Sequence, residues 1–401
     1  MNNNFKVAIV GGGSAGLLCA IELLLGDNAF KGEDIVILER NDRVGKKLIA
    51  TGNGQGNLTN KSISVSNYHG DKGFIRAFFP IFSEVDIENY LKNIGIYLTE
   101  GEDGKMYPLS MQAGAVLDVI RSFLAFKKCN ILTCFDVTDI EQNKNGFTIC
   151  SKKEKVYAEN VVCAFGGMAG KQYGTDGSSY FLLEKLGHKK TATYPSLVQL
   201  KADLLDFKNL KGIKERVKLK LISNNKFTFE EMGDLLFTDY GISGSSVFKL
   251  SSKMNLSESL FVSIEFLPDI SAEKLKEILE NKLKLNHIDM EDLLTGIINK
   301  QIGKIIVKRS QNIDEIVKLL KDFRLKITGS LGFNYAQVTK GGIVTDDVNP
   351  FTFQSKKVKN LYLVGELLNV DGDCGGYNLT FAFVSGILSA KNIKNRYAME
   401  K

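Results

Sequence analysis

The sequence predicts an α/β fold whose main domain is assembled from both ends of the chain. Three observations support this. Residues 5–25 read as an apolar strand, a glycine-rich turn and an apolar helix. Apolar and polar residues alternate at several places between Pro195 and Pro268, and helical periodicity follows from Ser271 to about Lys326. A further strand, glycine-rich loop and apolar helix occupy residues 360–393.

Composition limits the class of protein. The chain has 401 residues, more than one ordinary domain needs, with 44% apolar and 24% charged residues, as in soluble globular proteins. Its net charge of +6 is mild and its lysines are spread out, which disfavours a nucleic-acid partner. We find no signal-peptide pattern and no apolar run near the roughly 18 residues of a membrane helix. We therefore expect a cytoplasmic protein with a small-molecule substrate, no nucleic-acid partner and no membrane partner; the pattern does not indicate an oligomeric state.

Histidines and cysteines give no metal signal. The three histidines, at 69, 188 and 287, lie far apart in the sequence, and the six cysteines form no CxxC pair. Neither set has the spacing of a zinc site, and a histidine-based catalytic triad lacks support. We expect no metal.

The first strand and helix carry a dinucleotide-binding pattern. Gly11, Gly13 and Gly16 form a GxGxxG turn between them, and a second apolar strand ends at Glu39. In such turns the first glycine permits the tight bend, the second admits a pyrophosphate and the third allows close helix packing. The acidic residue accepts hydrogen bonds from ribose hydroxyls and disfavours a 2′-phosphate. The pattern therefore predicts a Rossmann-like domain that binds FAD or NAD.

The segment after Glu39 favours FAD. It continues as NDRVGKKLIATGNGQGNLTN, residues 41–60, instead of passing quickly to another strand and helix. Polar backbone with few large side chains suggests a segment that returns along an extended ligand. Further glycine-rich stretches follow the strand at 161–163 and the strand near 361–364. Such convergence of distant glycine-rich strand ends is expected of a domain that closes around a flavin.

These motifs together resemble the BaiN-like/aminoacetone-oxidase family of FAD-binding oxidoreductases. The resemblance runs nearly end to end and includes GGGSAG at 11–16, GKKLIATGNG at 45–54, LLFTDYGISG at 235–244 and LYLVGELLNVDGDCGGYNL at 361–379. It implies an FAD-binding Rossmann-like domain (1–193 and 341–401), a β-barrel-like, β-rich insert (194–270 and 327–340) and a small helical insert (271–326).

The residue patterns support both inserts independently. In VKLKLI, residues 217–222, apolar and lysine side chains alternate as in a half-buried strand. In SAEKLKEILENKLKL, Ser271 is placed to cap a helix whose apolar stripe contains Leu275, Ile278, Leu279 and Leu283. We expect this stripe to form the core of the insert.

The patterns and the resemblance predict cofactor-binding residues in several distant parts of the chain. These are Gly11, Gly13, Ser14, Ala15, Gly16, Glu39, Arg40, Lys47, Gly52, Asn53, Gly54, Asn57, Val137, Ala164, Gly166, Gly365, Glu366, Asp371, Gly376, Tyr377, Asn378 and Leu379. We expect Glu366 to bind the ribityl chain. We expect the helix that begins near Gly376 to stabilise negative charge on the reduced flavin.

The implied activity is that of an FAD-dependent oxidoreductase. A hydride would move between flavin N5 and a small or medium organic substrate. Two activities follow from the resemblance: reduction of an enone, with NAD(P)H as a transient donor, or oxygen-dependent oxidation of a small, aminoacetone-like amine. A non-enzymatic or RNA-directed flavoprotein is a further alternative. Since the flavin carries the chemistry, no side chain is assigned as catalytic; Asp239, Tyr240 and Tyr377 are candidates for facing the substrate, with a structural role as the alternative for each.

Three positions depart from the family pattern. Gln55 and Gly56 stand where relatives usually carry Arg and Cys, and Asp239 stands where relatives often carry His. The carboxyl of Asp239 would transfer protons in place of an imidazole only if its pKa were raised.

Overall fold

The computed structural model describes residues 3–26, 28–203, 208–254 and 259–399. The chain forms two compact units. The first contains Met1–Pro195 and Val338–Lys401, and the second contains Ser196–Gln337. The strands β11 (Tyr194–Ser196) and β18 (Val338–Lys340) lie where the chain crosses between them.

A seven-stranded sheet forms the centre of the first unit. Its strand order is β7-β2-β1-β10-β9-β8, and β19 also pairs with β10. The parallel strands are β1 (Asn4–Val10), β2 (Ile35–Leu38), β7 (Asn130–Leu132), β10 (Lys155–Cys163) and β19 (Leu361–Leu363), while β8 (Val137–Asn143) and β9 (Gly146–Ser151) add an antiparallel extension. The stretches 7–10, 35–38, 161–163 and 361–363 of the parallel strands are buried and apolar because both faces of such a sheet are covered.

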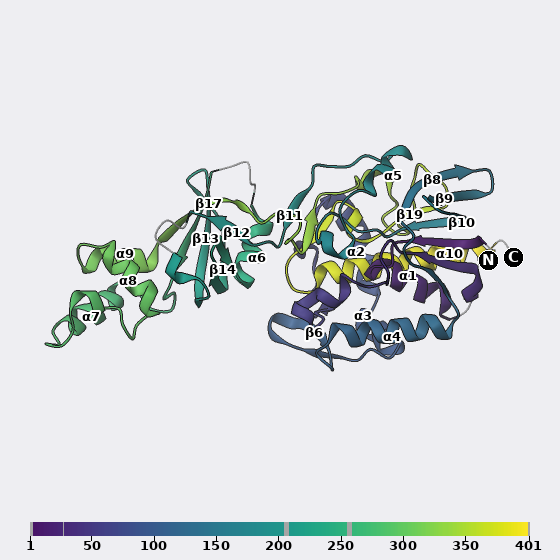
Figure 1. Ribbon diagram of the computed structural model, residues 1–401. Coiled ribbons are helices and arrows are strands. Elements are labelled where there is room, and N and C mark those ends of the chain that lie inside the picture. Colours follow the sequence, from purple (N-terminus) through teal and green to yellow (C-terminus); the bar gives the residue numbers. More distant parts are fainter. Residues whose placement is uncertain (1–2, 27, 204–207, 255–258, 400–401) are drawn as a thin grey trace. The chain divides into compact units, whose positions relative to one another are not determined.

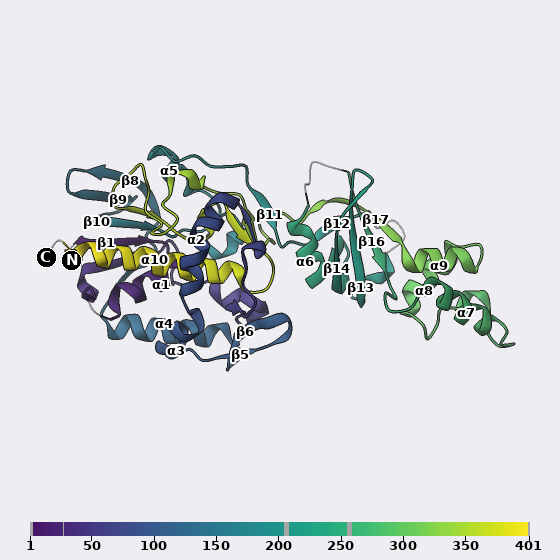
Figure 2. The same ribbon diagram turned by 180° about the vertical axis from the view of Figure 1, so that it is seen from behind.

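The two chain ends meet in helices α1 (Ser14–Leu24) and α10 (Tyr377–Met399), which lie side by side (Figures 1 and 2). A Cβ atom on Gly386 of α10 would lie 2.3 Å from the carbonyl oxygen of Ala15, so only glycine permits this approach. Further along the pair, the buried Lys394 Nζ lies 2.6 Å from Glu22 Oε1. Removing one partner of such a buried pair typically costs about 3–5 kcal/mol.

The remaining elements of the first unit surround this core. The helices are α2 (Lys72–Glu84), α3 (Ile87–Asn93), α4 (Ala113–Phe126) and α5 (Tyr180–Lys185). Small ladders join β3 (Thr59–Asn60), β5 (Leu98–Glu100) and β6 (Lys105–Pro108), and join β4 (Tyr68–Gly70) to β20 (Val370–Gly372).

The second unit is a closed barrel with helices (Figure 1). Its strands run in the order β12 (Leu200–Ala202), β15 (Gly241–Ser243), β14 (Lys226–Phe237), β13 (Lys214–Ser223), β16 (Leu260–Glu265) and β17 (Phe323–Ser330). As the alternation predicts, Val217, Leu219 and Leu221 of β13 fill the interior. The α/β fold class with a barrel is therefore confirmed.

The helices of the second unit are α6 (Ser245–Ser252), α7 (Ala272–Leu283), α8 (Lys300–Lys308) and α9 (Ile313–Lys321). Ser271 caps α7 by accepting a hydrogen bond from Lys274 N, and Leu275 and Leu279 are buried. Leu283 is exposed because it lies at the end of the helix. Strand β17 begins at Phe323, so the predicted boundary between residues 326 and 327 falls within a strand. The division of this unit into two inserts stays a prediction.

In the part of the chain that the structure describes, no helix is both long enough and apolar enough to cross a bilayer.

One histidine of the first unit is buried and has a perturbed pKa. His188 is 3% exposed, and its Nε2 atom lies 3.0 Å from Ser355 Oγ. Its Nδ1 atom is buried without a hydrogen-bond partner among the described residues. Burial lowers the pKa of His188 and outweighs the opposite effect of Asp347, while Lys357 lowers it further.

We expect the free energy of unfolding to fall as the pH drops through about 6.5, the ordinary histidine pKa. Below that pH His188 is protonated in the unfolded chain, whereas its lowered pKa keeps it neutral in the folded protein. This group contributes a slope of at most about 1.4 kcal/mol per pH unit. In His188→Gln that part of the slope should disappear. Urea unfolding of both proteins at about pH 7.5 and about pH 5.5 measures it, and equal pH dependence of the two unfolding free energies would contradict the prediction.

Candidate cofactor site

The turn between β1 and α1 holds three glycines with different physical roles. A Cβ atom on Gly11, where φ is +110°, would lie 2.5 Å from the carbonyl oxygen of Ala164. A Cβ atom on Gly16 would lie 2.1 Å from the carbonyl oxygen of Gly11. At Gly13, the residue before α1, a Cβ atom would meet nothing within 4 Å. Packing thus requires glycine at positions 11 and 16, whereas Gly13 keeps a space open at the start of α1, beside Ser14 and Ala15.

Glu39 lies beside this turn, at the end of β2. Its side chain is buried, and Oε2 accepts a hydrogen bond of 2.9 Å from Gly12 N. Oε1 accepts two more, from Asn41 N at 2.8 Å and Asn41 Nδ2 at 2.7 Å. Within the described ranges no cation pairs with this carboxylate. The open space at Gly13 and this fixed acid fit the diphosphate and ribose of an adenine dinucleotide. The sequence pattern gave no sign of Asn41, since its contact depends on a local turn.

Arg40 is held by two acids. Its Nη1 atom lies 2.8 Å from Asp176 Oδ1, and its Nε atom lies 3.2 Å from Asp136 Oδ1. Asp136 immediately precedes Val137, the first residue of β8. The predicted residues Arg40 and Val137 are thus brought near Glu39, but the guanidinium already has protein partners.

Lys47 and Glu366 join the two ends of the chain. Lys47 Nζ lies 2.6 Å from Glu366 Oε2, although 319 residues separate them. The other carboxylate oxygen accepts a 2.9 Å hydrogen bond from Thr339 N. The Thr339 hydroxyl in turn accepts hydrogen bonds from Met168 N at 2.7 Å and Ala169 N at 2.9 Å. Thr339 therefore fixes Glu366 relative to the loop that follows Ala164 and Gly166, a role that no sequence motif indicated.

The glycine-rich loops at residues 52–57 and 375–378 lie against each other. With its amide oxygen as acceptor, Asn57 lies 3.1 Å from Gly376 N. Asn60 Nδ2 donates to the Gly375 carbonyl at 3.0 Å, across 315 residues of sequence. A Cβ atom on Gly376 would lie 2.4 Å from the Thr59 carbonyl oxygen. This close approach explains the glycine at 376 and brings the loop of residues 52–57 to the start of α10.

Left-handed backbone shapes the first of these loops. Gly52, Asn53 and Gly54 have φ of +56°, +54° and +87°. A Cβ atom on Gly54 would meet nothing within 4 Å, so this residue, like Gly13, borders open space. Gly56 faces Ala113, the first residue of α4, with a distance of 3.1 Å from its ideal Cβ to Ala113 Cα. The cysteine usual in relatives would be strained at this position, where φ is +81°.

The start of α10 is fixed by side chains of its own loop. The Asn378 amide exchanges two 2.8 Å hydrogen bonds with the backbone of Gly372. Asp371 is buried in β20, which pairs with β4. Tyr377 is 8% exposed, and its ring packs edge-on against Tyr68 at 6.3 Å. This packing gives Tyr377 a structural role in the core. Leu379 is the third residue of the same helix, and Gly365 begins the turn after β19.

The other two substrate-facing candidates belong to the second unit. Asp239 and Tyr240 lie between β14 and β15. Asp239 Oδ2 lies 2.8 Å from Lys211 Nζ, and both side chains are more than half exposed. The hydrogen bond and charge of Lys211 lower the pKa of Asp239. Proton transfer by this carboxyl would require the opposite shift.

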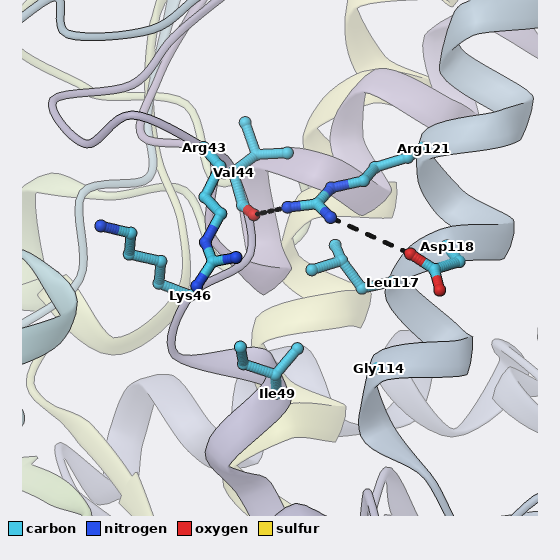
Figure 3. A pocket seen from close by; sticks show the side chains of 8 residues that line it. All are labelled: Arg43, Val44, Lys46, Ile49, Gly114, Leu117, Asp118 and Arg121. Atoms are coloured by element: carbon cyan, nitrogen blue, oxygen red, sulfur yellow. Dashed lines mark hydrogen bonds and ion pairs between the residues drawn. The ribbon is translucent and has the colours of Figure 1, made fainter.

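A pocket of about 190 Å³ lies between residues 43–49 and α4 (Figure 3). Three cations, Arg43, Lys46 and Arg121, contribute to its lining, and Arg121 Nη2 donates to the Val44 carbonyl at 2.8 Å. Val44 also touches the glycine turn, since its Cγ1 atom would lie 2.5 Å from a Cβ on Gly12. No predicted cofactor-binding residue lines this pocket.

In the described part of the chain, no group of three or more His, Cys, Asp or Glu side chains is placed to hold a metal ion.

Comparisons with known proteins identify the family of the chain. The family model described as "HI0933-like protein Rossmann domain" matches residues 5–392. A 3-dehydro-bile acid delta(4,6)-reductase of Clostridium scindens is 32% identical over 98% of this chain and 99% of its own length. A ribosomal RNA dihydrouridine synthase of Escherichia coli is 26% identical over 97% of this chain and 98% of its own length.

A solved structure supports the fold. A 3-ketosteroid-delta4-(5alpha)-dehydrogenase of Rhodococcus jostii, in complex with 4-androstene-3,17-dione, has a TM-score of 0.53 at 14% identity. The match covers 98% of this chain and 97% of that chain.

The fold, the glycine turn with its buried acid and these matches define the class of protein as an FAD-dependent oxidoreductase built on a Rossmann-like domain. The chain belongs to the HI0933-like family, and the resemblance to BaiN-like oxidoreductases is confirmed.

Gly13 provides a direct test of the site. In Gly13→Val the added Cβ atom meets nothing within 4 Å, so we expect the fold to survive, at a cost of about 1 kcal/mol for the changed helix cap. The side chain would occupy the space that we assign to the diphosphate, so the purified variant should be colourless. Absorbance and the FAD released on denaturation measure this.

Gly114→Ala is the matched control, because a Cβ atom there also meets nothing within 4 Å. It should retain FAD. A yellow Gly13→Val protein with normal FAD content would show that the diphosphate binds elsewhere.

Proposed function

We propose that this protein reduces a carbon–carbon double bond conjugated to a carbonyl group. One observation carries the proposal: two relatives that match almost the whole chain have different substrates but the same type of bond. The first is named as a delta(4,6)-reductase of a 3-dehydro-bile acid. The second makes dihydrouridine in ribosomal RNA, and dihydrouridine differs from uridine by saturation of the ring bond conjugated to a carbonyl.

FAD, when bound, supplies the hydride chemistry. The residues of the chain bind and orient it. The start of α1 and Gly13 would receive the diphosphate, and Glu39 would accept hydrogen bonds from the adenosine ribose. The predicted ribityl contact of Glu366 and the predicted cofactor contact of Lys47 are supported by the ion pair that brings these two residues together. Either residue would give up part of its 2.6 Å ion pair to bind a ribityl hydroxyl.

The amide groups at the start of α10 are suited to stabilise negative charge on the reduced flavin. α10 has 23 residues and begins at Tyr377. Its first N–H groups carry the positive end of the helix dipole. Placed at the pyrimidine edge of the flavin, they would stabilise the charge that accumulates there on reduction. The rigid clamp between Asn378 and Gly372 keeps these groups in position without reorganisation.

The electron donor and the substrate are proposed separately from the type of bond that is reduced. We propose NAD(P)H as a transient donor and a small or medium enone as the first candidate substrate, since the relative with the higher identity acts on a steroid acid. The second candidate substrate is a uridine base in RNA, favoured by the full-length match to the dihydrouridine synthase. It revives the RNA-directed alternative that the mild net charge disfavoured. Neither relative is named as an amine oxidase, and no contact in the site favours that alternative.

Anaerobic half-reactions test the proposal. NADH or NADPH should bleach the visible flavin absorbance of the purified protein, and an unsaturated 3-oxo-steroid or a uridine-containing RNA should restore it without oxygen. Mass spectrometry should then find a product heavier by the mass of H₂. Flavin-free Gly13→Val is the control and should form none.

The proposal would be wrong if neither acceptor reoxidised the reduced flavin anaerobically, while a small amine reduced the flavin and oxygen rapidly reoxidised it. Chemical reduction with dithionite tests the acceptor separately from the NAD(P)H donor. If dithionite-reduced protein saturates the double bond while NADH and NADPH leave the flavin oxidised, only the donor is wrong.

A further inference from the structure

The outer face of the barrel in the second unit carries a pocket of about 410 Å³. It is lined by Lys220 and Ile222 of β13, by Phe227 of β14, by Ser263 of β16 and by Arg324 of β17, with Asn225 in the turn between β13 and β14. These elements are neighbours in the barrel, so the pocket is a continuous part of one sheet surface.

The strand register places these side chains in two rows. Lys220 is opposite Ser263, which is opposite Arg324. Two residues further along β13, Ile222 is opposite both Phe227 and Phe261, and Phe261 is opposite Lys326. Directly opposite residues share a face, and the alternate residues Val217, Leu219 and Leu221 fill the interior. Both rows therefore point outward, and an aromatic row runs beside a polar one.

The aromatic row is accessible. Phe227 is 60% exposed, and Ile222 and Phe261 are half-buried. Phe227 leaves most of its surface in water and is not part of the barrel interior. The same ring, flanked by apolar neighbours and cations, is what base stacking requires in single-stranded nucleic-acid sites.

Cations outnumber acids around the pocket. Glu265 pairs with both Lys220, at 3.1 Å, and Lys321, at 2.9 Å. Asp322 accepts a 2.6 Å hydrogen bond from Ser263 Oγ and pairs with Arg324 at 2.8 Å. Lys326 is exposed and has no ion pair within the described residues. Lys218, on the same face, pairs with Glu230, which is opposite Lys220. Five cations therefore accompany three carboxylates, and the acids hold all of these cations except Lys326 in place.

We propose that this outer face of the barrel, defined by Lys220, Ile222, Phe227, Phe261, Arg324 and Lys326, binds single-stranded RNA. A base would stack on Phe227, and phosphates would lie against Arg324 and Lys326. The proposal rests on the second candidate substrate of the proposed function, a uridine base in RNA. It adds a surface for the strand that carries the base, which depends on no residue of the cofactor site.

Fluorescence anisotropy of a labelled oligouridine of about eight nucleotides, within the range of single-strand site sizes, tests the proposal on the FAD-bound, oxidised protein. We expect Phe227→Ala to weaken binding at least about fivefold, since loss of one stacked base has that effect. Phe227→Trp should restore binding. The matched control is Phe126→Ala, which removes an aromatic ring that is 81% exposed at the end of α4, and it should bind normally.

Salt dependence tests the phosphate contact. Lys326→Ala should lower the slope of log K against log salt by about 0.7, the value expected for one phosphate of a single strand. Lys304→Ala, which removes another exposed lysine from α8, should leave the slope unchanged. Circular dichroism and FAD content show whether each variant is folded.

Two results would overturn the proposal. One is that the wild-type protein does not bind the oligouridine. The other is that Phe227→Ala and Lys326→Ala both bind it with the affinity and salt dependence of the wild type. The readout needs no turnover, so its failure differs from failure of the proposed function. A protein that reduces an enone but binds no RNA contradicts this proposal alone, and one that binds RNA but reduces neither acceptor contradicts the proposed reaction.

Discussion

Helix α10 lies so close to helix α1 that a Cβ atom on Gly386 would be 2.3 Å from the Ala15 carbonyl oxygen. The buried ion pair between Glu22 and Lys394 fixes the far end of the same contact. Next to Gly386, Ser385 Oγ accepts a hydrogen bond of 3.0 Å from Gly365 N, which holds the end of β19 against the helix. One helix–helix contact therefore joins the two ends of the chain and sets where the C-terminal loops can lie.

The cofactor site follows from that constraint. Once β19 lies beside β10, Glu366 reaches Lys47, and the loop at 375–378 reaches Asn57 and Asn60. Glycine is required where backbones touch, as at Gly376, and it keeps space open where nothing touches, as at Gly13. That difference separates glycines that serve the fold from glycines that leave space for a ligand. The GxGxxG pattern predicted it for Gly11, Gly13 and Gly16, whereas no sequence pattern distinguished Gly54, which borders open space, from Gly376.

Local patterns predicted most of the fold. The GxGxxG turn, the acid at position 39 and the alternation in β13 each depend on residues close in sequence, and the structure contains the turn, the acid and the strand where they were expected. Partner choice was not predictable, because it depends on tertiary packing. Asn41 on Glu39 and Thr339 on Glu366 carry no motif. Tyr377 lies at the first turn of α10 with its ring packed against Tyr68, a contact that no motif indicated, and its role as a substrate-facing residue stays a prediction.

We expect residues from both chain ends to form one FAD site on the first unit. Diffraction from crystals of the protein with FAD bound tests this most directly. It should show the diphosphate at the amides of Gly13 and Ser14, the ribose at Glu39, and the isoalloxazine ring between residues 52–57 and the start of α10. Electron density for the flavin away from either glycine-rich loop, with the Lys47–Glu366 pair unchanged, would contradict it.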